Sequence, residues 1–569
     1  MTSDGYIRAE KRPRWLGIAG FSIAIFVAAP TVSLCVSALV ARSTSEAFGL
    51  DTLLRYLANS LWVSGGAGAL AAVIGIACAW LVTMCEFPGR RLFEWALVLP
   101  LAAPAYIIAY AYSDFLQHAG PVQTMLREVM HWGPRDYWFP NIRSLPGAIL
   151  VLGLVLYPYV YLLTRAALLE QNVAVLEASR SLGRTPWQSF WGVALPLARP
   201  AIVAGVSLVI METLADFGTV AHFGVQTLTT AIYQAYSYLG NQMIAAELAL
   251  VLLVTVLALL WLERAERGRA LTRSTGKAQR ALPRFKLTKL TVLVAVAACA
   301  LPICLGAVLP AGILIELAAQ FGQNIFTQRY LELLQHTLTL GFVGAAATIA
   351  AAILIAFAVR ATQNRQARAA MSLSVFGYAV PGPVIAIGIL VPLAALDNAI
   401  FSAAQNLFGV RTGLILTGSI VALTYAYIVR FLTIGFRSAE QSLARITPHM
   451  DAAARTLGVS EGGLLTRVHL PMMRGSLLSA GLLIFIEIVK ELPATLILRP
   501  FNYDTLAIQA YRLASDERLP EASSAALVIF AVSLISVFSL TRSIARSRVS
   551  SRDALESIEP PQVSARAYL

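Results

Sequence analysis

The sequence predicts an all-α, polytopic membrane protein with about 12 transmembrane helices arranged as two parallel repeats of about six. Three observations lead to this fold class. Of the 569 residues, 57% are hydrophobic and only 13% are charged, about half the charged fraction of an average soluble domain. The chain contains twelve apolar segments long enough to cross a bilayer, and its second half repeats the first.

The first apolar segment follows a basic N-terminus with Arg8, Lys11, Arg12 and Arg14. It is too long for the core of a signal peptide and lacks a small-residue cleavage site, so we expect a first span with a cytoplasmic N-terminus. The expected spans lie near 15–40, 58–83, 93–113, 145–168, 198–221, 242–262, 290–317, 333–359, 370–396, 413–434, 475–498 and 521–541.

Basic residues are concentrated in short connections between the apolar segments, and they account for the net charge of +13. Segment 263–289 is the most basic connection, and the tail 542–569 is also rich in arginine. Because cytoplasmic loops carry the excess of Lys and Arg, both segments are expected in the cytoplasm and the mixed-charge loop 114–143 on the outer side. Membrane topology explains the charge, so no nucleic-acid partner is expected.

The two halves, 1–262 and 290–541, are joined by the basic linker 263–289 and followed by the tail. Gly183 and Gly458 lie 275 residues apart, and the same offset relates Pro196 to Pro471. Each half has an even number of spans, so both halves point the same way across the membrane. A substrate pathway is expected at the interface of such repeats.

A polar insert interrupts each half, EASRSLGRTPWQSFWGVALPLARP at 177–200 and AAARTLGVSEGGLLTRVHLPMMRG at 452–475. In the first, a short helix is expected to end at Gly183, and Thr185 with Gln188 forms a capping box for a second helix. In the second, Ser460 is the expected cap, but position 463 is Gly and cannot complete the box. Both inserts are expected to form cytoplasmic knobs.

These inserts resemble the signature E-A-A-x-x-x-G followed by L-P of permease subunits of binding-protein-dependent ABC importers. The matching residues are Glu177, Ala178, Gly183, Leu195 and Pro196 in the first half, and Ala453, Ala454, Gly458, Leu470 and Pro471 in the second. The second half departs from the pattern, because Ala452 stands at the Glu position and Asp451 lies one residue earlier.

The resemblance implies that each insert is a coupling helix seated in a cytoplasmic ATPase. It further implies two ATPase copies that bind ATP and Mg²⁺, a soluble substrate-binding protein, and a bacterial cytoplasmic (inner) membrane with both termini in the cytoplasm. Segments 212–224, 227–233, 490–501 and 505–511 resemble those of double-length ferric iron permeases. Ferric iron is therefore the expected substrate, with another small solute such as a phosphonate, or an ion-coupled secondary transporter, as alternatives.

Two pairs of acids follow the inserts inside apolar segments, Glu212 with Asp216 and Glu487 with Glu491. The i, i+4 spacing predicts that each pair shares one helix face. Intramembrane acids are costly unless they line a pathway or are paired, and carboxylate oxygens suit Fe³⁺. The acids either form a translocation path or are neutralised as clamps or gates by basic residues: Lys490, Arg165 and Arg430.

No pattern for catalysis or tight metal binding stands out. The five cysteines lie in or beside apolar segments without a CxxC pair, and the six histidines are scattered. No P-loop or catalytic triad is found, so this chain is expected to be a transport subunit and not an enzyme. It is expected to bind no cofactor and to hold no stable metal.

Overall fold

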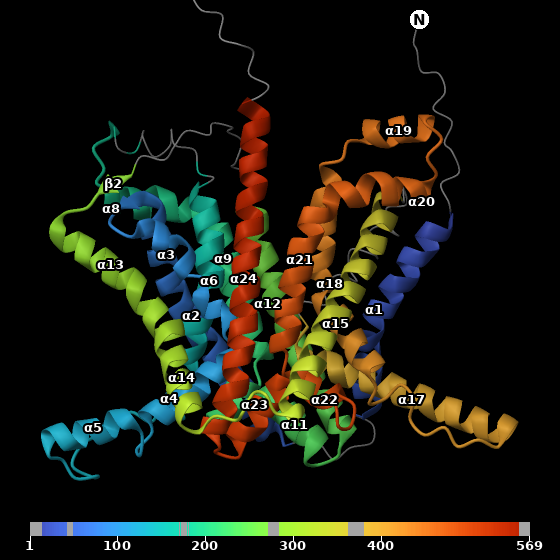
Figure 1. Cartoon of the computed structure of the whole chain (residues 1–569), viewed down its shortest axis with the longest axis horizontal. Helices are drawn as coiled ribbons and strands as arrows, with labels where there is room; N and C mark the ends of the chain where they lie inside the picture. Colours follow the sequence, from blue (N-terminus) through green and yellow to red (C-terminus); the bar gives the residue numbers. More distant parts are fainter. Residues whose placement is uncertain are drawn as a thin grey trace, which may run out of the picture.

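The computed structural model describes residues 14–41, 49–169, 171, 179, 181–270, 284–361 and 380–556, and these residues form a helical bundle (Figure 1). Eleven of the described helices are long and apolar enough to cross a membrane, and a bent pair raises the number to 12. The predicted fold class is confirmed.

The first half contains six membrane-crossing units in chain order. They and their connecting elements are α1 (Arg14–Ala41), α2 (Leu50–Met84), the strand β1 (Cys85–Glu86), α3 (Arg90–Ala96), η1 (Leu99–Ala102), α4 (Ala105–Leu116), α5 (Pro121–Met130), α6 (Leu145–Leu169), α8 (Pro186–Ser189), η2 (Phe190–Ala194), α9 (Leu195–Ala215), α10 (Gly218–His222), α11 (Leu228–Ser237) and α12 (Gln242–Ala270).

The second half follows the same order. Its elements are β2 (Phe285–Lys286), α13 (Lys289–Ile303), η4 (Cys304–Val308), α14 (Leu309–Phe321), α15 (Gln328–Ala361), α17 (Gly382–Phe408), α18 (Ile420–Ala444), α19 (Pro448–Thr456), α20 (Glu461–Leu464), η6 (Leu465–His469), α21 (Leu470–Lys490), α22 (Pro493–Leu498), α23 (Leu506–Ser515) and α24 (Leu519–Glu556).

Equivalent elements keep the sequence offset seen between the repeats. Helix α6 starts at Leu145 and α18 at Ile420, 275 residues later, and α9 and α21 keep the same offset at both ends. One end of the bundle carries α8, α19 and α20 (Figure 1). The described part of α1 starts at this end, and the described part of α24 finishes there. Helices α5, α11 and α23 lie at the opposite end (Figure 1).

Prolines set several helix boundaries. The expected span 93–113 is broken, because Pro104 has an extended backbone before α4 and the two parts meet at 88°. Pro196, Pro310 and Pro471 each lie two residues after the end of a π-helical turn. A proline cannot donate to the carbonyl four residues back, which favours the wider turn before it.

Two expected span boundaries are wrong in the second half. The segment 413–434 was expected to be one span, but α18 begins only at Ile420. The preceding loop is held by the carboxylate of Asp397, which accepts backbone hydrogen bonds from Ile415, Leu416 and Thr417. Helix α17 extends to Phe408, well beyond the expected end at 396, while residues 370–379 lie outside the described part of the chain.

The first helix of each half packs against helices of the other half. Helix α1 lies against α15 and α17, and the Tyr425 hydroxyl donates to the carbonyl of Phe26. Conversely, α13 contacts α2 and α3, and the Cys78 thiol donates to the carbonyl of Ala298 at 3.6 Å. Figure 1 shows this exchange, with α13 beside α2 and α1 beside α15. The two halves are therefore interlocked.

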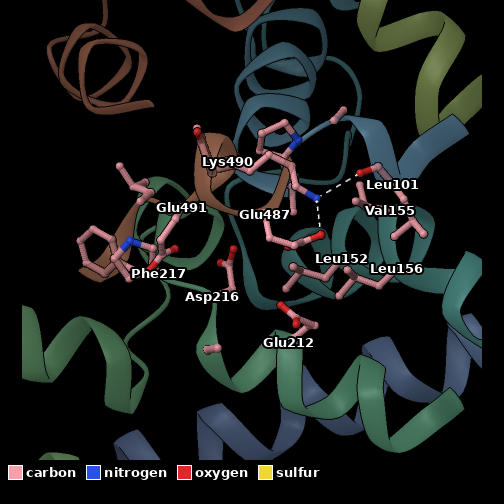
Figure 2. Close-up of a pocket in the computed structure, with 18 of the residues that line it drawn as sticks. Leu101, Leu152, Val155, Leu156, Glu212, Asp216, Phe217, Glu487, Lys490 and Glu491 are labelled. Carbon is pink, nitrogen blue, oxygen red and sulfur yellow. Dashed lines mark hydrogen bonds and ion pairs between the residues drawn. The ribbon is translucent and has the colours of Figure 1, made fainter. Parts of the chain in front are cut away.

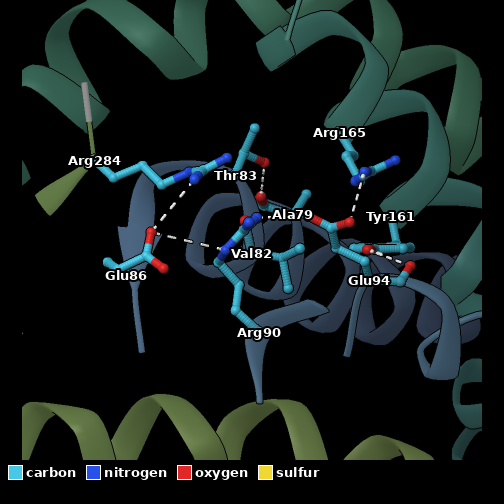
Figure 3. Close-up of polar contacts among 9 residues, drawn as sticks. All are labelled: Ala79, Val82, Thr83, Glu86, Arg90, Glu94, Tyr161, Arg165 and Arg284. Carbon is cyan, nitrogen blue, oxygen red and sulfur yellow. Dashed lines mark hydrogen bonds and ion pairs between the residues drawn. The ribbon is translucent and has the colours of Figure 1, made fainter. Parts of the chain in front are cut away.

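A short parallel strand pair fixes the described end of the basic linker. Strand β2 pairs with β1 at the end of α2, and Arg284 lies 3.4 Å from Glu86 (Figure 3). Arg90 is buried below this pair, where it donates to the carbonyl of Val82 and contacts Glu94. The expected linker 263–289 is therefore partly structured, since α12 runs to Ala270 and β2 lies on the first half.

Candidate functional site

The first insert adopts the predicted local structure in the part that the structure describes. Gly183 has φ +78°, a left-handed conformation that favours glycine. The Thr185 amide donates to Gln188 Oε1 at 2.9 Å, and the Gln188 amide donates to Thr185 Oγ1 at 3.3 Å, so the capping box is confirmed. Leu195 and Pro196 open α9. Glu177 and Ala178 lie outside the described residues.

The second insert has the same plan with one cap fewer. Gly458 has φ +79°, and the amide of Val459 closes the end of α19 by donating to the carbonyl of Ala454 at 3.1 Å. The Gly463 amide donates to Ser460 Oγ at 3.2 Å, and Gly463 has no side chain to return the bond. Ala453 lies in α19, while Leu470 and Pro471 open α21. We use the name coupling segments, after the role that the resemblance implies for the inserts, for residues 179, 181–194 and 448–469 of the described chain.

The second coupling segment is tied to the membrane helices by a charged cluster that the sequence did not reveal. Asp451 accepts from Arg360 Nη2 at 2.8 Å and from His469 Nε2 at 2.9 Å. Arg360 also donates to the carbonyls of Leu443 and Ile446. Arg360 at the end of α15 thus contacts α18 and α19, and Asp451 of α19 connects to η6 through His469.

Burial raises the pKa of Asp451, but the hydrogen bonds from His469 and Arg360 outweigh this effect and leave the pKa below its ordinary value. A lowered pKa means that folding stabilises the ionised form of this carboxyl group. Its contribution to folding stability is therefore fully present above the ordinary carboxyl pKa of about 3.9 and is lost only as the pH falls below that value. The Asp451 carboxylate is therefore ionised at neutral pH.

In the part of the first coupling segment that the structure describes, hydrogen bonds between neutral groups connect it to its surroundings. Gln171 Nε2 donates to the carbonyl of Ala194 at 2.8 Å, and the hydroxyls of Ser179 and Ser189 lie 3.0 Å apart. Exposed aromatic side chains of Trp187 and Trp191 cover its outer surface. The two segments share a backbone plan but differ in chemistry.

The four intramembrane acids come together, although not in the predicted way. Each pair was expected on one face of a continuous helix, but α9 ends at Ala215 and α21 ends at Lys490. Asp216 and Glu491 occupy extended positions just beyond these helices. The prediction of one shared helix face per pair is therefore wrong.

The carboxylates at the breaks start the next short helices. Asp216 accepts from the amides of Thr219 and Val220 at 3.0 and 3.2 Å, and Glu491 accepts from the amide of Ala494 at 3.0 Å. A carboxylate near the first turn of a helix satisfies amides that have no helical partner. In the sequence, the residues that could have indicated these helix breaks are Gly218 at the start of α10 and Pro493 at the start of α22.

A cavity lies where α9 and α21 end, and all four acids line it (Figure 2). The space between its lining residues amounts to about 720 Å³, a value that includes open solvent. Glu212 and Asp216 come from the first half and Glu487 and Glu491 from the second. The cavity therefore lies between the repeats, where a pathway is expected.

Two cations of the second half reach into this cavity. Lys490 Nζ lies 3.0 Å from Glu487 Oε1, and Arg430 Nη1 lies 3.5 Å from Glu491 Oε1. The Lys490 ammonium also donates to the carbonyl of Leu101 in the first half, at 3.3 Å (Figure 2). Arg165, the third expected partner, instead pairs with Glu94 at 3.6 Å (Figure 3).

The acids are repeated in both halves but the cations are not. Ala215 stands at the position equivalent to Lys490, and Val155 at the position equivalent to Arg430. Gly382 makes room for the arginine, because a Cβ on it would lie 2.7 Å from Glu491 Oε1 and would also meet Arg430. In the first half Ala105 takes that place, because it opens α4 after Pro104 as Gly382 opens α17 after Pro381.

Tyr106 is a further cavity residue that the sequence did not single out. It lines the cavity and is 5% exposed, and its hydroxyl has no hydrogen-bond partner among the described residues. A buried polar group without a partner needs an explanation. The described residues contain no group of three or more His, Cys, Asp or Glu side chains suited to hold a metal ion.

Comparison with known proteins shows which family this chain belongs to. Residues 71–269 match the family of binding-protein-dependent transport system inner membrane components. The sulfate transport system permease protein CysW of Escherichia coli (strain K12) is 30% identical over 226 residues, covering 37% of this chain and 75% of that protein. The chain belongs to this family. The permease family supplies membrane subunits of ABC importers, so this chain is the permease component of such an importer.

Two further relatives differ in length. The Fe(3+)-transport system permease protein FbpB 2 of Haemophilus influenzae is 24% identical over 485 residues, which cover 83% of this chain and 86% of that protein. The molybdenum transport system permease protein ModB of Escherichia coli (strain K12) is 29% identical over 221 residues, covering 37% of this chain and 93% of that protein. The present permease is therefore double the length of some relatives.

Proposed function

We propose that this permease carries ferric iron, delivered by a soluble binding protein, through the cavity between its two halves. The observation that supports this most directly is the set of four carboxylates from both repeats around one cavity. Hard oxygen ligands suit a small, highly charged cation. Two of the four are already paired with cations, which favours weak binding and hence release.

The length of the chain supports the same substrate. The relative named for Fe(3+) transport matches across most of both chains, whereas the relatives named for molybdenum and sulfate match one half of this chain. The family assignment removes the ion-coupled secondary transporter as an alternative. The Tyr106 hydroxyl supplies a further oxygen beside the carboxylates.

The proposal includes partners and topology. Two copies of a cytoplasmic ATPase, which bind ATP and Mg²⁺, dock on the two coupling segments, and the binding protein docks at the opposite end near α11 and α23. The permease halves are 1–262 and 290–541, in a bacterial inner membrane with both termini in the cytoplasm. The position of α8, α19, α20 and the described terminal helices at one end of the bundle supports this topology (Figure 1).

The cavity offers a specific observation for a second substrate class. Arg430 and Lys490 are cations that an oxyanion such as molybdate, sulfate or a phosphonate prefers. Both are engaged by carboxylates, however, and the acids outnumber them. Oxyanion transport is therefore the alternative that the experiment must separate from iron transport.

The test is uptake of radiolabelled Fe³⁺ by cells without their own ferric importers that express the permease with its binding protein and ATPase. Glu212→Gln and Glu487→Gln are each expected to lower uptake at least about tenfold, the effect of losing about 1.4 kcal/mol of transition-state stabilisation. Glu440→Gln, which alters an exposed pair with Arg437, is the matched control.

Two results would contradict the proposal in different ways. Wild-type levels of uptake in both cavity variants would remove the acids from the pathway. Uptake of radiolabelled molybdate or sulfate, but not of Fe³⁺, by the wild-type complex would replace ferric iron with an oxyanion while leaving the importer assignment intact.

A further inference from the structure

Lys490 lines the cavity and makes polar contacts with both halves of the permease. Its ammonium donates to Glu487 in its own helix at 3.0 Å and to the carbonyl of Leu101 in η1 of the first half at 3.3 Å. The side chains of Lys490 and Glu487 are only 14% and 18% exposed. A charge-assisted hydrogen bond at this burial is stronger than one at the surface.

The Leu101 carbonyl is available because of the break in the first half. Pro100 and Pro104 flank it, and the chain between α3 and α4 turns through 88° at this place. A continuous α-helix would use this carbonyl within its own ladder. The break therefore presents an acceptor to the cavity, and Lys490 reaches it at the end of α21 (Figure 2).

The contact has no counterpart across the pseudo-twofold axis. The residue equivalent to Lys490 is Ala215, which cannot donate a side-chain hydrogen bond. Charge neutralisation alone does not account for the lysine, because Arg430 already supplies a cation to this half of the cavity, 3.5 Å from Glu491. The lysine is thus an addition to one half that spans the gap to the other.

We propose that Lys490 is a latch that joins the two halves across the cavity in this conformation and must release Leu101 each time the permease opens. Alternating access moves the repeats relative to each other around the cavity. A contact made in only one conformation stabilises that conformation, so its loss increases the population of the others. On the proposed function a transported cation would take over the Glu487 oxygen from the lysine; the latch itself follows without that step.

The experiment measures ATP hydrolysis by the purified permease–ATPase complex without binding protein and without iron. Lys490→Met removes the ammonium and keeps most of the stem. It is expected to raise this basal rate about tenfold or more, the factor that corresponds to one charge-assisted hydrogen bond. Arg518→Met is the matched control, because Arg518 also pairs with an acid three residues away, Glu521, but at an exposed position.

An exchanged variant separates a latch from simple charge neutralisation. Glu487→Lys with Lys490→Glu keeps both charges and their spacing, but moves the ammonium about 4.5 Å along the helix, away from Leu101. A latch predicts that the basal rate stays raised in this variant. Neutralisation alone predicts a return to the wild-type rate.

The outcomes decide the proposal. A wild-type basal rate in Lys490→Met overturns the latch, as does a wild-type rate in the exchanged variant. If Lys490→Met fails to assemble, the exchanged variant decides by itself, since both charges remain in the cavity. Because iron is absent from this assay, failure of the ferric iron proposal would appear only in the uptake experiment.

Discussion

Arg430 and Gly382 depend on each other for space. The side chains of Arg430 and Glu491 are 12% and 4% exposed, and the absence of a Cβ on Gly382 is what lets them meet beside α17. In the first half the corresponding pair is Val155 and Ala105, an apolar residue beside a methyl group. The two repeats therefore differ at both residues of this contact, and each difference makes room for or depends on the other.

Gly382→Ala is expected to destabilise the permease by about 1–3 kcal/mol, the usual cost of overpacking a buried contact. Thermal denaturation of the purified protein in detergent measures the effect. Gly312→Ala is the control, because no atom lies within 4 Å of a Cβ added there. An equal and small change in both variants would show that Arg430 can move aside freely.

Tyr106→Phe is expected to lower Fe³⁺ uptake severalfold with little change in stability. Its hydroxyl has no protein partner among the described residues, so its removal leaves no described group unsatisfied. Tyr157→Phe is the control, because its hydroxyl also lacks a partner in the described part of the chain but does not line the cavity. Equal uptake by the two variants would argue against a substrate contact for Tyr106.

At the scale of elements, charged side chains attach the second coupling segment to the bundle. Arg360 holds α19 through Asp451 and also donates to two carbonyls at the end of α18. If an ATPase docks on this segment as proposed, its motion would pass through Arg360 to α15. Exposed Trp187 and Trp191 give the first segment a larger apolar contact surface.

Arg360→Met is expected to uncouple the second segment, because it removes the guanidinium that pairs with the Asp451 carboxylate and leaves the hydrogen bond from His469. ATP-driven uptake should fall while the protein still assembles, and protease cleavage within 445–460 should become faster. Arg437→Met, an exposed cation of α18, serves as the control. Unchanged uptake and unchanged cleavage would show that Arg360 is only a surface charge.

The sequence predicted the elements better than the contacts between them. The repeat offset can be read directly from the sequence and recurs in the helix boundaries. The structure also confirms local features, namely the left-handed Gly183 and Gly458 and the caps at Thr185 and Ser460. The helix breaks at the acids were missed because the apolar pattern continues through them. The contact from Lys490 to Leu101 joins residues 389 positions apart, which no periodicity reveals.

At the scale of the whole molecule, the exchanged first helices predict that the halves hold together without a covalent link. A chain divided within 271–283 and expressed as two fragments should yield a complex that survives purification through a tag on one fragment. Removal of residues 1–48 from the first fragment should weaken recovery of the second, since α1 packs on α15 and α17. Full recovery after this deletion would contradict a stabilising role for the exchange.

The exchange also imposes an order on biosynthesis. Helix α1 is complete at Ala41, but its partner α15 begins only at Gln328. At about 5–20 residues per second, a ribosome needs tens of seconds to synthesise the intervening chain. During that interval α1 sits in the bilayer without the surface it later covers, so the nascent permease must retain it near the insertion site or recapture it by lateral diffusion.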